Sequence, residues 1–271
     1  MYKTLPILII FLSACSSSID QQYVIETHQI KIGEIRISYD LQSGDTIGVF
    51  PVGYHNGQPG TPGDIAYPVN IPFIFDNNTW RPLNEDYFFT NEDILDIYAY
   101  YPYDPRIGYE EGMLRISQYS FDLSDQTKKI DLLWAKNTIE TRFENIVNLS
   151  FSHLFSKITI RLYLENLANE EVNISIHNLK TSATVDLATG TATANNISNV
   201  IIPVLMNDQT GVIREYEAIV PPQEILTGTS LLYFSIGEQH TLYTTNQSIL
   251  LQQGTNQTFE LTLITNTMPG L

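Results

Sequence analysis

The sequence predicts an all-β protein built from sandwich domains, and three observations support this prediction. Apolar residues alternate with polar ones along many short segments, which is the pattern of half-buried strands. No window keeps an apolar stripe at helical spacing for more than about two turns. Glycine-containing turns separate the alternating segments, and the length of 271 residues suits two domains of about 100 to 150 residues each.

The alternating segments give the expected strands in chain order. They cover residues 30–37, 47–50, 94–101, 147–151, 158–164, 172–176, 216–220, 231–236 and 259–263. The alternation changes parity between Phe155 and Ile158, which predicts a bulge or bend there. Residues 51–72 hold five prolines and four glycines, so we expect an irregular excursion there rather than a strand pair.

The boundary between the two domains is expected where polar residues interrupt the apolar pattern. Charged and polar residues between 136 and 146 follow the apolar segment Leu132–Trp134 and precede the next strands. We therefore expect a first sandwich over residues 29–143 and a second over residues 144–271.

The N-terminus reads as an export signal. Lys3 is followed by an eight-residue apolar run, Leu5–Leu12, which is too short for a membrane span and suits a secretory signal. Ser13, Ala14 and the single cysteine, Cys15, come next, and Leu12–Cys15 resembles the lipobox of bacterial lipoproteins. That resemblance implies a signal peptide over residues 1–14, acylation of Cys15 and a short polar tether over residues 15–28. The alternative is a plain signal peptide with an incidental cysteine.

Composition excludes several classes of function. Apolar residues make up 43% of the chain, so a sizeable core can be buried. The 14 Lys and Arg residues against 30 Asp and Glu give a net charge of -16, which argues against nucleic acid as a partner because phosphates need cations. A single cysteine excludes internal disulfides and multi-cysteine metal clusters.

The catalytic inventory is thin, and the sequence predicts no enzyme, no cofactor and no metal site. The five histidines are far apart and make no zinc-binding motif, and His153 is expected to be structural. No nucleophile elbow, P-loop or dinucleotide fingerprint follows a strand. Paired acidic residues could serve a glycosidase, but solvated loop charge is the favoured interpretation. These pairs are Glu85-Asp86, Glu92-Asp93, Glu110-Glu111 and Glu170-Glu171.

Tyrosines cluster in one expected strand. Tyr98 and Tyr100 share a face of the segment Ile94–Tyr101 and are candidates for contact with a ligand such as a glycan. Tyrosine is also a good strand former, so a structural role is the favoured interpretation.

Several segments, in order along residues 15–265, resemble the fimbrillin family of type V pilins and related lipoproteins from Gram-negative anaerobes. These segments are Gly44–Phe50 (GDTIGVF), Trp80 followed by Asp96–Tyr103 (DIYAYYPY), Asp131–Ala135 (DLLWA), Leu149–Ile158 (LSFSHLFSKI), Ala218–Gln223 (AIVPPQ) and Leu251–Leu263 (LQQGTNQTFELTL). Each motif alone is weak, whereas the ordered set behind a lipobox is fairly specific.

The resemblance implies two transthyretin-like β-sandwich domains in tandem and a structural or adhesive role in fimbriae as pilus subunit, anchor or tip. It implies attachment to the outer membrane, exposure at the cell surface, and other fimbrial subunits, further copies of this chain or a surface receptor as partners. In such pilins a trypsin-like protease cuts after an arginine near the mature N-terminus, and Arg36 is the candidate here. Loss of the first strand then opens a groove that a strand of another subunit fills. The alternative function is a glycan-binding surface lipoprotein.

Overall fold

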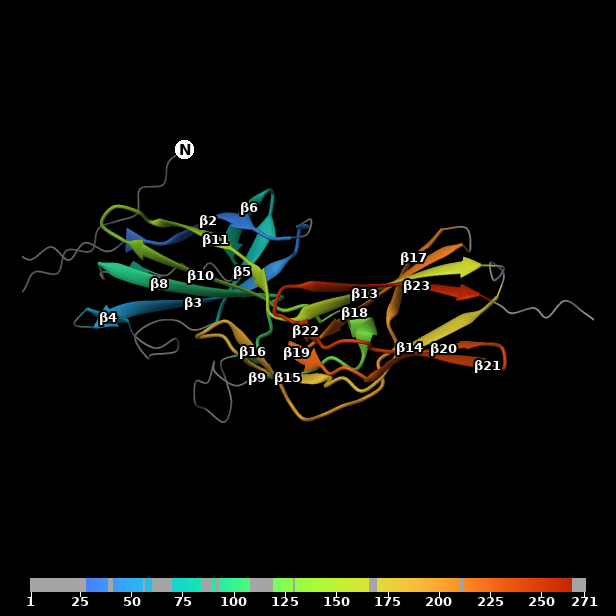
Figure 1. Cartoon of the computed structure of the whole chain (residues 1–271). Helices are drawn as coiled ribbons and strands as arrows, with labels where there is room; N and C mark the ends of the chain where they lie inside the picture. The colour runs from blue at the N-terminus through green and yellow to red at the C-terminus, as the bar shows by residue number, and fades with distance from the viewer. Residues whose placement is uncertain are drawn as a thin grey trace, which may run out of the picture.

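The computed structural model describes residues 28–38, 41–55, 57–59, 70–83, 89–90, 93–107, 119–128, 130–165, 170–209 and 212–264. Within these ranges the protein is all-β, and its one helical element is the single 3₁₀ turn η1 (Gln126–Lys128). No helix in the described part is long and apolar enough to cross a membrane. The strands form two lobes that lie end to end (Figure 1).

The first lobe has three layers of strands, and these strands come largely from the first half of the chain. They are β1 (His28–Gln29), β2 (Lys31–Arg36), β3 (Thr46–His55), β4 (Gln58–Pro59), β5 (Ile71–Asp76), β6 (Thr79–Pro82), β7 (Phe89–Thr90), β8 (Ile94–Tyr101), β9 (Tyr119–Asp122), β10 (Leu133–Glu140), β11 (Ile146–Ser150), β12 (Ser152–His153), β15 (Ser182–Asp186) and β16 (Thr191–Ala194).

The centre of the first lobe is a seven-stranded sheet. Its strands lie in the order β12-β10-β8-β3-β5-β6, and β4 extends β3 as a short hairpin. β8 is the middle of this sheet and is buried on both faces, because other strands cover the sheet above and below. Side chains at alternate positions of β3 and β8 therefore belong to two separate cores.

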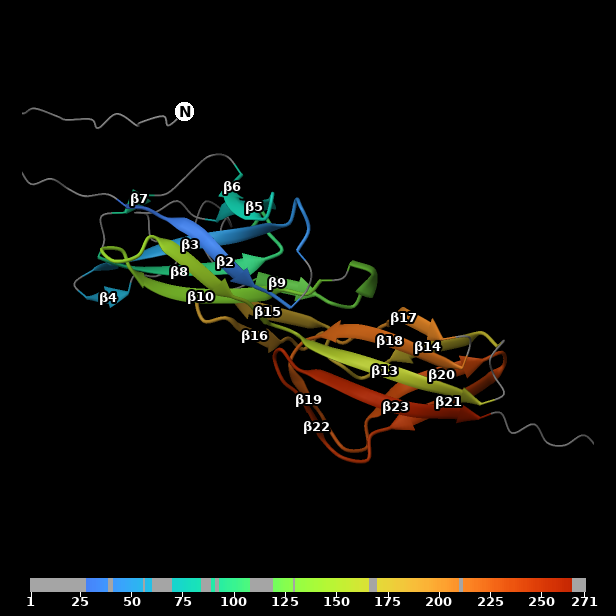
Figure 2. The ribbon, with the colours of Figure 1, turned by 90° about the horizontal axis from the view of Figure 1, so that it is seen from above.

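A two-stranded sheet of β2 and β11 covers one face of the central sheet. Figure 2 shows both strands lying across β3, β8 and β10. The core between these layers contains Ile30 and Ile32 from the first strands, Val147 and Leu149 from β11, and Phe73 from β5. Ile30, Val147 and Leu149 are almost fully buried, so this layer is a true half of a sandwich.

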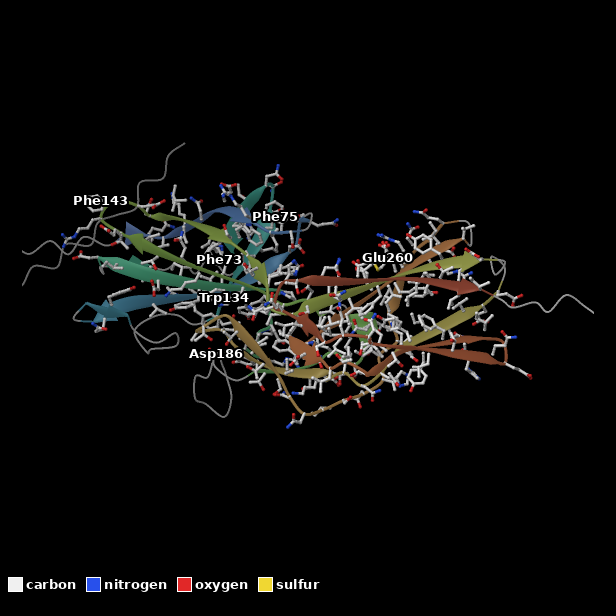
Figure 3. The ribbon with its side chains drawn as sticks, viewed as in Figure 1. Phe73, Phe75, Trp134, Phe143, Asp186 and Glu260 are labelled. Carbon is white, nitrogen blue, oxygen red and sulfur yellow. The ribbon has the colours of Figure 1, made fainter. Side chains whose placement is uncertain are left out.

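A three-stranded sheet of β9, β15 and β16 covers the opposite face. Its residues Ala183 and Val185 pack with Tyr98 and Tyr100 of β8. The Trp134 indole also points to this side and donates a 2.7 Å hydrogen bond to the Leu187 carbonyl (Figure 3). The β15–β16 turn comes so close to Trp134 that any side chain at Gly190 would clash with the indole ring.

The second lobe is a sandwich with one core. A four-stranded sheet, β17-β18-β13-β23, faces a three-stranded sheet, β14-β20-β21, and the short pair β19–β22 closes one end. The strands are β13 (Ser156–Glu165), β14 (Val172–Ile176), β17 (Val204–Gln209), β18 (Ile213–Val220), β19 (Gln223–Ile225), β20 (Ser230–Ile236), β21 (Gln239–Thr244), β22 (Ile249–Leu251) and β23 (Asn256–Ile264). β13 is an inner strand of the four-stranded sheet, since it pairs antiparallel with β18 and parallel with β23.

The first lobe takes strands from both halves of the chain. β15, which follows β13 and β14 in the chain, pairs with β9 of the first half. β11 likewise pairs with β2 although it follows residue 143. The boundary predicted between residues 143 and 144 stays a prediction, and strands from either side of it pair with one another.

Each segment expected from alternation overlaps a strand of the structure, which confirms those strands, although Ile30, Ile37 and Phe151 lie just outside them. The parity change before Ile158 is confirmed as well, because the chain bends at Leu154 and Phe155 between β12 and β13. The irregular excursion predicted over residues 51–72 was wrong at both ends. Residues 51–55 continue β3 and pair with β4 and β8, and Ile71 and Pro72 begin β5. Pro51 and Val52 are buried, so packing holds this segment in the sheet.

Candidate functional site

The first long strand, β2, is the element with the most unusual position in the first lobe. It pairs in parallel with β11, and in the described residues it has no second hydrogen-bonded neighbour. The Lys31 N–H donates to the Asn145 carbonyl at 2.9 Å, and the Phe151 N–H donates to the Arg36 carbonyl at 2.8 Å. Ladder bonds thus fix the strand at both of its ends, along one edge.

The inward face of β2 is apolar and its outward face is charged. Ile30 and Ile32 are 0% and 7% exposed, and Ile35 packs against the same core. Lys31, together with Glu34 farther along, is exposed to solvent. β2 therefore covers one face of the central sheet with apolar side chains.

A bulge keeps the isoleucines on one face. Ile32 pairs with Val147 and Ile35 pairs with Leu149, so β2 spends three steps where β11 spends two. The Asn148 side chain fills the irregularity, because its Oδ1 accepts a 2.8 Å hydrogen bond from the Glu34 N–H. A methyl group at Gly33 would lie 2.5 Å from that oxygen, so only glycine fits there without a shift.

A groove of about 670 Å³ runs along the open edge of β2. One wall is Gln29 with residues 31–34, and the opposite wall is residues 78–80 with Pro82, at the turn and strand that end the central sheet. Phe73 contributes to the floor, and the Trp80 ring packs against Phe75 with centroids 5.2 Å apart. Two sheet edges thus face each other across a groove with polar and apolar lining, which is where a further strand can pair.

The chain beyond β2 is held by three side chains. The Ser38 hydroxyl lies 2.5 Å from His153 Nε2, and His153 Nδ1 lies 2.8 Å from an Asp131 carboxylate oxygen. The hydrogen bond to Asp131 raises the pKa of His153 against the opposing effect of burial. His153 is structural in this arrangement, as expected from the sequence.

Arg36, the expected processing residue, ends β2 with an exposed guanidinium. Its side chain is 74% exposed and pairs with Glu34 at 3.2 Å, a contact that solvent weakens. A protease can thus reach the side chain, whereas the Arg36 carbonyl accepts the N–H of Phe151, the residue after β11. Cys15, the expected lipidation residue, lies outside the described residues.

The tyrosines proposed as ligand contacts are core residues. Tyr98 is 6% exposed and Tyr100 is 0% exposed, because the β9–β15–β16 sheet covers their face of β8. The Tyr100 hydroxyl donates to Asn70 Oδ1 at 2.7 Å, and burial raises its pKa. A ligand cannot reach either ring in this structure, so the structural interpretation of these residues is the one that holds.

Metal-binding geometry is not found in the part of the chain that the structure describes, where no three His, Cys, Asp or Glu side chains gather. Of the acidic pairs, Glu85-Asp86 and Glu110-Glu111 lie outside the described residues, as does Glu92. Asp93 forms a surface ion pair with Arg142.

Sequence reasoning missed Ser38, Asp131 and Asn148 as partners of the β2 region. Each contact joins residues more than 90 positions apart, or joins a loop to a strand end, so no local pattern indicates it. The one local signal was Gly33, which interrupts the spacing of the isoleucines.

Comparison with known proteins identifies the family. No curated protein matches the sequence. The solved structure of a candidate cell adhesion protein from Bacteroides uniformis matches with a TM-score of 0.68 at 22% identity, over 88% of this chain and 93% of that one. A second such protein, from Bacteroides ovatus, gives 0.66 at 19% identity over 88% and 92%.

A third, from Bacteroides thetaiotaomicron, gives a TM-score of 0.54 at 16% identity over 91% of this chain and all of that one. At these identities the three structures establish a shared fold. The profile of the family described as Fimbrillin-like matches residues 36–270. Because that match spans most of the sequence, the chain belongs to the fimbrillin-like family.

Proposed function

We propose that this protein is a non-catalytic fimbrial or adhesive subunit that assembles by exchange of β2 for a strand of another subunit. The observation that carries the proposal is that β2 covers an apolar core while pairing along one edge alone in the described residues. Membership of the fimbrillin-like family supports it, as does the shared fold with proteins described as candidate cell adhesion proteins.

The energetic argument concerns what removal of β2 would expose. Burial of Ile30 and Ile32 contributes about 3 to 6 kcal/mol together. Whole domains have a free energy of unfolding of only about 5 to 15 kcal/mol. A first lobe without β2 is therefore close to unstable, and the N–H and C=O groups of β11 lose their partners as well. Both losses are relieved if another strand takes the place of β2.

The cut that would release β2 lies at its end. Cleavage after Arg36 leaves Ile30, Ile32 and Ile35 on the departing peptide and keeps β11 on the subunit. The groove of about 670 Å³ between β2 and β6 would widen by the width of one strand. An incoming strand from a second subunit makes a head-to-tail contact, which propagates as a filament.

The proposal includes the location of the protein. We expect acylation at Cys15 to hold it at the outer membrane, facing outward, and its two lobes to correspond to the two transthyretin-like sandwiches of fimbrillins. Several acyl chains anchor a protein stably. The Cys15→Ser variant should leave the membrane fraction or keep its signal peptide. Wholly membrane-bound, fully processed Cys15→Ser protein would contradict the lipid anchor.

Limited trypsin digestion tests the strand exchange. We expect a form that begins at Ile37 and that either multimerises or binds a synthetic peptide of residues 28–36, measured by intact mass and gel filtration. The same peptide with Ile30 and Ile32 replaced by Asp is the control and should not bind, because its inward face is no longer apolar. A trimmed protein that stays a stable, soluble monomer and ignores both peptides would sink the proposal.

A further inference from the structure

The three side chains beyond β2 join the cleavage region to the central sheet. His153 belongs to β12, and β12 pairs with β10 in register Leu133 to His153. Asp131 precedes β10 by two residues, and its carboxylate contacts Nδ1 of the His153 ring. Ser38, two residues after Arg36, is therefore tied through one imidazole ring to the edge of the rigid seven-stranded sheet.

We propose that Ser38, His153 and Asp131 form a histidine clip that limits protease access to the Arg36–Ile37 bond and does so most strongly in acid. The inference rests on the proposed function in one respect, that Arg36 is the processing residue. It adds a control step, because release of β2 would then depend on opening a specific contact.

Access to the bond requires the chain on both of its sides to leave the surface. A protease binds several residues around the bond as an extended segment, which here is blocked twice. On one side the Arg36 carbonyl accepts the Phe151 N–H at 2.8 Å, and on the other side Ser38 contacts His153 at 2.5 Å. Loss of the second contact removes one hydrogen bond that opening must break, which corresponds to about a threefold to tenfold change in the open population.

The charges around His153 favour its protonated form. Asp131 faces Nδ1, and the Lys157 ammonium from β13 opposes protonation but is itself paired with Glu217 at 2.9 Å. The turn that packs on the His153 carbonyl, around Gly254, has only uncharged neighbours, Gln253 and Thr255.

The sign of the pH dependence follows from these contacts. The hydrogen bond to Asp131 raises the pKa of His153 above its value of about 6.5 in an unfolded chain. Asp131 stays bound to Nδ1 whether or not Ser38 leaves, so the coupling runs through Nε2. The charged ring donates Nε2–H to the Ser38 hydroxyl in a charge-assisted hydrogen bond, whereas the neutral ring has only a weaker neutral bond to it. The extra strength is present while His153 is charged and is lost as the pH rises through its folded-state pKa. The clip should therefore open more readily near pH 8 than near pH 6.

The test compares cleavage after Arg36 with cleavage after Arg142 in the same chain. Arg142 is an internal reference for trypsin's own pH dependence, because it lies in a turn beside Phe143, which is 83% exposed (Figure 3). In the native sequence the ratio of the two rates should rise between about pH 6 and about pH 8. His153→Gln should raise the ratio about threefold to tenfold at the lower pH and make it nearly independent of pH.

His177→Gln is the matched control, since His177 makes the same kind of bond to Ser175, at 2.8 Å, in the second lobe. It should leave the ratio unchanged. Ser38→Ala provides a second variant that removes the clip with an exposed side chain and little risk to folding. Equal, pH-independent ratios in the native chain, His153→Gln and Ser38→Ala would overturn the clip.

Hydrogen exchange of the amides of residues 37 and 38 gives the same answer without a protease. After correction for intrinsic exchange, the protection factors of these amides should be higher near pH 6 than near pH 8. They should fall in His153→Gln, and unchanged protection factors would contradict the clip. Strand exchange is judged separately by multimerisation and peptide binding. A chain that trims under control of the clip but stays monomeric would uphold the clip and contradict the proposed function.

Discussion

Asp96 shows at the residue scale how the central sheet tolerates charge. Its side chain is 0% exposed, yet every strand beside it supplies a partner. Lys136 on β10 pairs with it at 2.8 Å, and Thr138 on the same strand donates at 2.5 Å. The hydroxyls of Tyr54 and Tyr98 donate from β3 and β8. The carboxylate therefore joins three neighbouring strands through satisfied hydrogen bonds.

Replacement of Asp96 by Asn should destabilise the protein clearly. The amide keeps the shape but leaves the Lys136 ammonium without its counter-charge, so we expect the free energy of unfolding to fall by about 2 to 4 kcal/mol. The lower part of that range allows for Lys136, whose side chain is 35% exposed. Urea unfolding measures the change.

Asp93→Asn is the control for that measurement, three residues away. Asp93 pairs with Arg142 at 2.6 Å, but both side chains are more than half exposed, so its loss should cost about 0 to 1 kcal/mol. Equal losses in the two variants would show that burial adds nothing to the contribution of Asp96.

Tyr98 and Tyr100 show why a sequence alone does not separate a core from a binding surface. An aromatic residue at every second position suits an exposed platform and a buried strand face equally well. What decides is whether a further layer covers that face, and here the layer comes from β15, more than 80 residues later in the chain. The site residues that depend on such distant pairing were therefore beyond prediction.

At the scale of elements, the sequence predicts where β2 lies in the chain, but it does not predict which strand pairs with it. The isoleucines at 30, 32 and 35 mark the strand, and Gly33 marks the bulge that brings Ile32 and Ile35 to one face. Nothing near them in the sequence indicates β11, whose Asn148 lies 114 positions away from Glu34. Strand identity follows from local alternation, whereas sheet order follows from packing of the whole lobe.

β10 was not predicted as a strand, because its local composition is misleading. Lys136, Asn137 and Thr138 give the centre of β10 the polar composition of a linker, which is why the sequence predicts a domain boundary there. In the structure Leu133, Ala135 and Ile139 face a core, while Lys136 finds its partner in buried Asp96. A charged residue on a strand is compatible with a sheet interior when a counter-charge exists, and composition does not show the counter-charge.

At the scale of the whole molecule, the two lobes are joined by side chains as well as by the chain segments that pass between them. Gln126 in η1 is 8% exposed and holds β18 of the second lobe by two hydrogen bonds. Its Nε2 donates to the Ile219 carbonyl at 2.9 Å, and its Oε1 accepts the Ile219 N–H at 2.7 Å. A bidentate amide of this kind acts like one rung of a sheet between the lobes.

A second glutamine makes a similar bridge at the surface. Gln253 accepts from the Ala192 N–H at 3.2 Å and donates to the Gly190 carbonyl at 2.8 Å, and it is exposed. It ties the β15–β16 turn to the turn before β23. The two glutamines thus share their chemistry and differ in burial.

This difference predicts unequal effects for the same substitution. Gln126→Ala leaves the backbone N–H and C=O of partly buried Ile219 without these partners, so the free energy of unfolding should fall by about 1 to 3 kcal/mol. Gln253→Ala removes an exposed side chain whose place water can take, and its cost should stay within about 0.5 kcal/mol. Chemical unfolding of both variants measures the costs, and hydrogen exchange at Ile219 should increase in Gln126→Ala alone. Equal costs, or unchanged exchange at Ile219, would mean that the lobes are held together by the β9–β15 pairing without help from Gln126.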